Sequence, residues 1–120
     1  MPRRRDPRLY LEEILEAVAN IEADTEGLDL GRFRADRRVR QLVERNIEII
    51  SEASRRIPDN FKATEPDIPW TEIAGIGNVL RHDYGAVRPE ILWGVRANRL
   101  LPLRLAVERI RRKLAKATGE

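Results

Sequence analysis

The sequence predicts an all-α fold, an antiparallel bundle of four or five helices in a single domain of 120 residues. Apolar residues recur at steps of three and four along several segments, which is the period of an amphipathic helix. No segment alternates apolar and polar residues over a useful length, as a half-buried strand would. Proline and glycine mark the breaks between the periodic segments. These observations together favour a helical bundle over any fold with a sheet.

The first helix is predicted from Pro7 to Thr25. Asp6 supplies a capping carboxylate, and proline is favoured at the first helical position that follows it. One apolar stripe then runs along the segment, formed by Leu11, Ile14, Leu15, Val18 and Ile21. Gly27 ends this helix.

A second long helix is predicted from Asp36 until Pro58 stops it. The stretch "LDLGRFRAD" before it is interpreted as a short connection with a helical turn. Asn46 lies on the apolar stripe of the second helix, between Leu42 and Ile50. A buried amide needs a hydrogen-bonding partner, so we expect Asn46 to face either another helix or a cleft, and its place on the stripe agrees with a dimer.

The rest of the chain predicts a loop and three more helices. "IPDNFKATEPDIPW" is a proline-rich loop with a short helical turn at residues 59–63. The third helix carries one apolar stripe and ends at Gly85. The fourth helix begins at Arg88-Pro89-Glu90, and the last helix follows Asn98. The stripe of the third helix is Trp70, Ile73, Gly77, Leu80 and Tyr84, and the seam of the last is Leu100, Leu103, Val107, Ile110 and Leu114. We interpret that last seam, and Trp70 and Trp93, as core or interface residues.

Composition excludes several classes of protein. The chain has no cysteine and one histidine, which excludes disulfides, thiolate metal sites and a zinc site built from several imidazoles of one chain. We therefore expect no metal. No apolar run is long enough to span a bilayer, and the basic start lacks the apolar stretch of a secretory signal. We expect a cytoplasmic protein without membrane contact, with flexible tails at residues 1–6 and 117–120.

The net charge is only +3, but the basic residues gather in three clusters. Arginine outnumbers lysine in them, and its fork of donors suits phosphate. Such clusters fit an RNA partner or an acidic protein partner; on charge alone, solvated helix faces are the favoured interpretation. The clusters are Arg3, Arg4, Arg5 and Arg8; Arg32, Arg34, Arg37, Arg38 and Arg40; and Arg109, Arg111, Arg112, Lys113 and Lys116.

The stretch "GIGNVLRHDYG", residues 75–85, concentrates the candidate chemistry. Glycine is unfavourable inside a helix, so Gly75 and Gly77 predict the close approach of another backbone or of a ligand. Asn78 and His82 are four residues apart and share a helix face. An imidazole can take and give the protons that attack by an RNA 2′-hydroxyl requires. The alternative is that His82 only caps the helix end.

Two strings carry a family resemblance. "WTEIAGIGNVLRHDYGAVRPEILWGV", preceded by "VERNIEIISEASRRIP", resembles the HepT-like branch of the HEPN superfamily. The resemblance implies a helical bundle that forms a homodimer with a basic cleft at its interface. In such proteins an arginine and a histidine, separated by four to six residues, cleave RNA without metal or cofactor. The resemblance also implies a partner, a small nucleotidyltransferase antitoxin (MntA-like) that uses ATP to adenylylate a tyrosine of the toxin.

The resemblance assigns roles to individual residues. His82 corresponds to the signature histidine, Asn78 to the polar residue that follows the signature arginine, and Tyr84 to the adenylylated tyrosine. Gly77 stands where the arginine is expected, which leaves the phosphate without its usual guanidinium. Arg81 is the candidate to bind phosphate in its place, although it points about 100° away from His82 on the helix.

Three functions fit the sequence. The favoured one is a HepT-like toxin of a toxin–antitoxin pair, a ribonuclease in which His82 acts and Asn78 supports it, and which adenylylation of Tyr84 switches off. The second is a catalytically degenerate dimer that binds the nucleotidyltransferase or RNA, because Gly77 replaces the arginine. The third is a structural helical dimer whose "HDY" only ends a helix.

Overall fold

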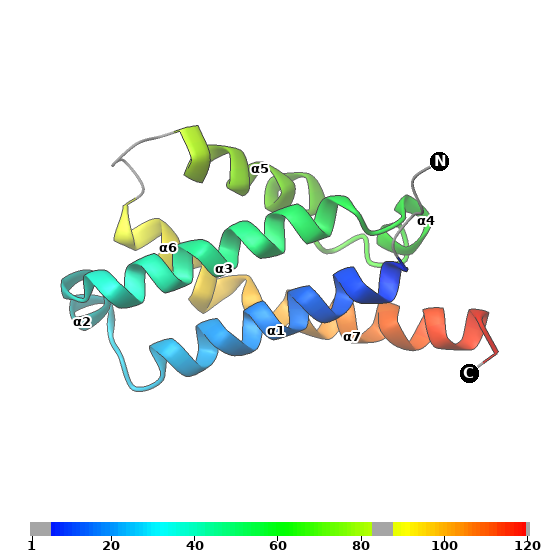
Figure 1. The fold of residues 1–120 in the computed structure, drawn as a ribbon, viewed down its shortest axis with the longest axis horizontal. Helices are drawn as coiled ribbons and strands as arrows, with labels where there is room; N and C mark the ends of the chain where they lie inside the picture. Colours follow the sequence, from blue (N-terminus) through cyan, green and yellow to red (C-terminus); the bar gives the residue numbers. More distant parts are fainter. Residues whose placement is uncertain (1–5, 83–87, 120) are drawn as a thin grey trace.

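The computed structural model describes residues 6–82 and 88–119, and this part of the chain is helical without any strand. Five longer helices and two short ones occur in it (Figure 1). The longer ones are α1 (Pro7–Thr25), α3 (Arg37–Arg55), α5 (Trp70–His82), α6 (Pro89–Asn98) and α7 (Leu100–Ala117); the short ones are α2 (Leu30–Ala35) and α4 (Asp59–Lys62). The prediction of an all-α fold is confirmed.

Local capping explains where the helices begin. The Asp6 carboxylate accepts the Arg8 amide at 3.0 Å, and Pro7 follows as the first residue of α1. Asp36 accepts the Val39 amide at the start of α3. Each aspartate satisfies an amide that has no partner inside its helix. The bounds predicted for α1 are therefore confirmed, and Gly27 follows its end with a positive φ of 76°.

Two boundaries differ from the prediction. The helical turn predicted in the connection is the six-residue helix α2 at residues 30–35, which fills most of that stretch because Asp29 caps it by accepting the Arg32 amide at 2.8 Å. Helix α3 ends at Arg55, before Pro58 is reached. Proline disfavours helical geometry in the residue before it, so the helix stops ahead of the proline.

The core lies between α1, α3 and α7. Helix α3 packs on α1 and on α5, and α7 packs on α1. Figure 1 shows α1 and α3 running in opposite directions along the long axis, with α5 reversing again beside α3. The predicted seam of α7 is buried along its length, from Leu100 at 3% exposure to Leu114 at 8%. That seam is core, as predicted.

Helix α2 is held at one end of the bundle by an aromatic contact. Phe33 is fully buried, and its ring lies 5.2 Å from the Trp93 ring of α6. The Arg96 guanidinium stacks over Trp93 and donates to the Thr25 hydroxyl of α1 at 3.0 Å. These contacts fasten α2, α6 and the end of α1 to one another.

Candidate functional site

Helix α5 carries the candidate residues of the site. Asn78 is exposed on this helix, and His82 is its last residue, one turn further along. Arg81 also belongs to the helical backbone of α5. Tyr84, predicted as the modified tyrosine, lies outside the described residues, as does Gly85, the predicted helix end. The structure thus places Asn78, Arg81 and His82 within two turns of one helix.

Helix α5 is fastened to α3 one turn before Asn78. The Ser51 hydroxyl of α3 accepts the Gly77 amide at 3.0 Å and donates to the Ala74 carbonyl at 2.8 Å. Ser51 is 1% exposed, so both bonds are shielded from water. A hydroxyl that both donates and accepts here satisfies two backbone groups of the neighbouring helix. This contact fixes the distance between α3 and the helix that carries Asn78 and His82.

Arg55 is a residue of this region that sequence reasoning missed. It lies one turn after Ser51 on α3, and its Nη2 atom donates to the same Ala74 carbonyl at 2.8 Å. Its side chain is otherwise on the surface. The contact places a guanidinium against the backbone of α5, one turn before Asn78. Nothing in the local sequence marks Arg55, because the contact joins residues 19 positions apart.

The two glycines of α5 have different surroundings. Gly77 is buried against α3, and the short bond from its amide to Ser51 agrees with the predicted close approach of another helix. Glycine permits such an approach because it has no Cβ. No other backbone of this chain approaches Gly75, where an added Cβ would meet no atom within 4 Å, and the approach of a ligand there stays a prediction. Gly75 therefore faces open space rather than a packed neighbour.

Asn46 finds its partners inside the chain. Its amide nitrogen donates to the Leu42 carbonyl at 2.8 Å, and its oxygen accepts from Asn20 of α1 at 3.3 Å. Asn46 is 7% exposed. The predicted partner across a helix interface is thus found between α1 and α3. Because these bonds satisfy the amide within one chain, Asn46 gives no support for a dimer.

Hollows on the described surface are poor sites for a polyanion. A groove of about 330 Å³ between α1 and α3 is lined by Glu13, Glu16, Asn20 and Asn46, and an adjoining hollow adds Glu48, Glu52 and one cation, Arg45. Carboxylates there would repel phosphate. An apolar cavity between α3, α5, α6 and α7 measures only about 20 Å³, which is room for about one water molecule.

Comparison with known proteins identifies the family. The model of the family described as "Ribonuclease HepT-like" matches residues 14–110, from α1 to α7. The chain belongs to the HepT-like ribonuclease family. A probable ribonuclease HepT of Thermococcus cleftensis is 40% identical over 90 residues, which is 75% of this chain and 82% of that protein. No solved structure gives a significant match.

Further relatives carry related names. A putative RNase of Methanocaldococcus jannaschii is 35% identical over 92 residues, covering 77% of this chain and 84% of its own. A putative RNase of Caldanaerobacter subterraneus is 34% identical over 89 residues, covering 74% and 80%. The family match includes Asn78 and His82. It confirms the predicted family, and it leaves the predicted roles of these residues untested.

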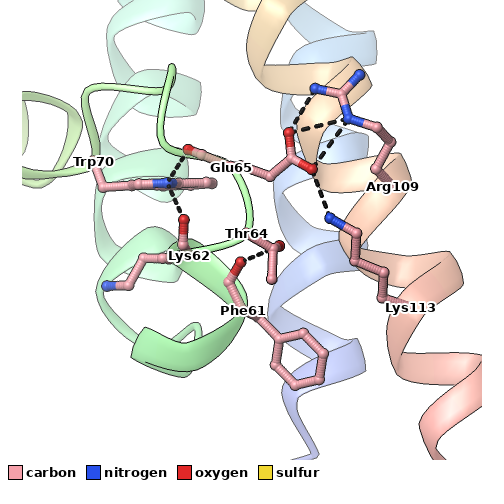
Figure 2. A network of polar contacts seen from close by, with 7 residues as sticks. All are labelled: Phe61, Lys62, Thr64, Glu65, Trp70, Arg109 and Lys113. Carbon is pink, nitrogen blue, oxygen red and sulfur yellow. Dashed lines mark hydrogen bonds and ion pairs between the residues drawn. The ribbon is translucent and has the colours of Figure 1, made fainter.

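In this HepT-like chain, an ion-pair cluster around the buried Glu65 holds the loop before α5. Figure 2 shows the Glu65 carboxylate between Arg109 and Lys113 of α7, with contacts of 2.6 and 2.8 Å. The Trp70 indole donates to the carbonyls of Lys62 and Glu65, both at 3.1 Å. The bonds from Arg109, followed by those from Lys113, lower the pKa of Glu65 to about 2 although burial opposes this. The start of α5 is thereby fixed to α7.

Two further properties of the HepT-like chain follow from the described residues. Across residues 6–82 and 88–119, no three His, Cys, Asp or Glu side chains come together as they would around a metal ion. None of the helices described there is long and apolar enough to cross a membrane.

Proposed function

We propose that this protein is the toxin of a toxin–antitoxin pair, a metal-independent endoribonuclease that works as a homodimer and is regulated by adenylylation of Tyr84. One observation carries the proposal. In a chain of the HepT-like ribonuclease family, an exposed Asn78 and the single histidine, His82, lie one turn apart at the end of α5. The names of the relatives agree with ribonuclease activity.

His82 is the proposed acid–base group. One imidazole takes the proton of a 2′-hydroxyl, whose oxygen attacks the adjacent phosphorus, and the 5′-oxygen leaves with a proton from a second group. The chain has only one histidine. A homodimer supplies a second imidazole, so that one copy acts as the base and the other as the acid. Val79, beside Asn78, is 54% exposed and offers apolar surface for the partner copy.

A cation must stabilise the charge that develops on the phosphate. Gly77 stands at the position of the signature arginine, and losing such a donor typically lowers the rate by about 10²–10³. Arg81 on α5 is one candidate to replace it. Arg55 is a second, because its guanidinium is held against α5 at Ala74. Arginine suits this role because its fork of donors matches a phosphate.

Tyr84 is the proposed regulatory residue. It follows His82 by two residues. When the Tyr84 oxygen attacks the α-phosphorus of ATP, pyrophosphate leaves, the phenol proton passes to water, and the new adenylyl group adds bulk and a negative phosphodiester beside the histidine. Both effects would keep a polyanionic RNA away from His82. The proposed partner is therefore a nucleotidyltransferase that modifies this tyrosine.

RNA cleavage by the purified protein tests the proposal. We expect the wild type to cleave a labelled RNA in the presence of EDTA and the His82→Ala variant to be inactive. Circular dichroism of each variant verifies that it is folded. Cleavage that persists in His82→Ala, or that requires a divalent cation, would contradict the proposed mechanism.

A second function has its own support. The burial of Gly77 and the bond from its amide to Ser51 give this position a packing role, which fits a dimer that binds its nucleotidyltransferase or RNA without cleaving it. Incubation with the nucleotidyltransferase and ATP, followed by mass spectrometry, tests this function. A gain of one adenylyl group on Tyr84, together with no RNA cleavage by the unmodified protein, would favour the binding module over the enzyme.

A further inference from the structure

The arginines of residues 29–40 gather at one end of the bundle. This segment holds five arginines and two aspartates, and it forms α2 and the first turn of α3. Figure 1 shows α2 at one extreme of the long axis, the end toward which α5 runs and at which α6 begins. Phe33 is fully buried against Trp93, so α2 is anchored there. Arg32 and Arg34, on either side of Phe33, are exposed.

Three of these arginines have neither an acidic partner nor a hydrogen bond from the side chain among the described residues. Arg34 pairs with Glu90, and Arg40 donates to the Arg34 carbonyl. The remaining three, Arg32, Arg37 and Arg38, are exposed, and none has a carboxylate within ion-pair distance in the part of the chain that the structure describes. The neighbouring Asp29 and Asp36 accept bonds from backbone amides as helix caps.

The position of Arg37 and Arg38 opposes the local stability of α3. Both lie in the first turn of the helix, which holds no acidic residue. The amino-terminal end of a helix carries a partial positive charge and favours anions, so two cations there are unfavourable. The Asp36 carboxylate, which caps the helix, offsets only one of these two charges, and local rules are expected to be broken at functional or strained sites. An anionic ligand would compensate the unfavourable charges.

The basic cluster of α7 is neutralised to a larger extent, although Arg112 and Lys116 have no carboxylate partner among the described residues. Arg109 and Lys113 of α7 pair with Glu65, and Arg111 pairs with Glu12. Carboxylates line the groove between α1 and α3. The end of the bundle at α2 is therefore a surface where a polyanion meets guanidinium groups that are not already paired.

We propose that Arg32, Arg37 and Arg38 form a binding site for the phosphodiester backbone of RNA. The proposal rests on the proposed function, because it supplies the surface that presents RNA to the histidine of α5. Each guanidinium can hold a phosphate through two parallel hydrogen bonds. Contacts of this kind position a strand without reading its bases. RNA binding at this end should therefore be independent of sequence and sensitive to salt.

Charge reversal at Arg37 and Arg38 tests the site. The probe is a fluorescein-labelled, fully 2′-O-methylated RNA, which lacks the attacking hydroxyl and stays intact, and fluorescence anisotropy gives its Kd. For Arg37→Glu/Arg38→Glu we expect the Kd to rise by about tenfold or more, and the slope of log K against log salt to shrink by about 0.7 for each lost contact. Because glutamate suits the first turn of a helix, the Tm should stay equal or rise.

The matched control is Arg112→Glu/Lys116→Glu. Both residues are exposed, lie on α7 toward the opposite end of the molecule (Figure 1), and pair with no carboxylate within the described ranges. This double variant makes the same change in net charge, and we expect its Kd for the RNA probe to stay within about threefold of the wild-type value. Equal weakening by both pairs, or an unchanged Kd for Arg37→Glu/Arg38→Glu, would overturn the proposal.

Two parallel assays separate this proposal from the others. Cleavage of unmodified RNA that depends on His82 but not on Arg37 and Arg38 would refute this site and retain the ribonuclease. Binding lost in Arg37→Glu/Arg38→Glu, with cleavage absent from every variant, would retain the site and refute the ribonuclease. If Arg37→Glu/Arg38→Glu loses binding to the nucleotidyltransferase while its affinity for RNA is unchanged, the surface binds an acidic protein instead of RNA.

Discussion

Replacing Glu65 with glutamine removes the charge at the centre of the cluster that fixes the start of α5. The Glu65 side chain is 8% exposed and contacts Arg109 at 2.6 Å and Lys113 at 2.8 Å. Glutamine keeps the shape of the side chain but turns one acceptor into a donor that faces two cations. The substitution leaves Arg109 and Lys113 without their counter-charge.

The pKa of Glu65 sets the size of the effect. Its fall from 4.5 to about 2 corresponds to an upper limit of about 3.4 kcal/mol, at about 1.36 kcal/mol for each pKa unit. Arg109 and Lys113 are 45% and 41% exposed, and water screens their attraction for the carboxylate. We therefore expect Glu65→Gln to lower the free energy of unfolding at pH 7 by about 2 kcal/mol.

The pKa of Glu65 also determines how its contribution to stability changes with pH. The folded-state pKa of Glu65 lies below its unfolded value, so the stabilisation is complete above about pH 4.5 and is lost as the pH falls toward about 2. The difference in stability between the wild type and Glu65→Gln should accordingly shrink between pH 5 and the acid limit of folding, and stay constant between about pH 6 and 8.

Urea unfolding measured by tryptophan fluorescence is the assay. Trp70 bonds to the carbonyl of Glu65 and reports on this region directly. The control is Glu12→Gln, which removes an exposed carboxylate 3.0 Å from Arg111 and should change stability by less than about 1 kcal/mol. A Glu65→Gln variant as stable as that control at pH 7, or a difference that grows on acidification, would refute the reasoning.

Other substitutions test individual contacts by urea unfolding. Gly75→Ala should stabilise the protein by about 0.5–1 kcal/mol, because its Cβ enters open space in α5; a loss of stability would show that the position is packed. Ser51→Ala should destabilise the protein by about 1–2 kcal/mol and speed hydrogen exchange of the Gly77 amide, since both bonds to α5 disappear. Unchanged exchange would show that Ser51 does not protect this amide. Asp36→Ala should cost about 1 kcal/mol by uncapping α3, and no loss would mean that water replaces the cap.

The family and the helices could be predicted from the sequence because both depend on local patterns. Asp6 followed by proline caps a helix wherever it occurs, and the steps of three and four define a stripe before any partner is known. The strings around Asn78 and His82 indicated the HepT-like family, and the match over residues 14–110 confirms it. The order of residues along one helix also fixed the spacing of Asn78 and His82.

Contacts between distant segments could not be predicted in this way. Asn46 was expected to need a partner, but which helix supplies it depends on how α1 lies against α3, and Asn20 does so. The glycine rule could not separate Gly75 from Gly77, because both obey the same local physics. Only the packing of α3 decides that Gly77 is buried and Gly75 is not.

The sequence by itself thus determined the helical class, the family and the residues that α5 carries. Only the tertiary structure decided that Arg55 touches α5 and that Glu65 is buried between two cations of α7. It also decided that Arg32, Arg37 and Arg38 have no carboxylate partner among the described residues. The physical reason is the range of the interactions. Helix periodicity and caps act within about four residues, whereas charge pairing depends on which surfaces the fold brings within about 4 Å.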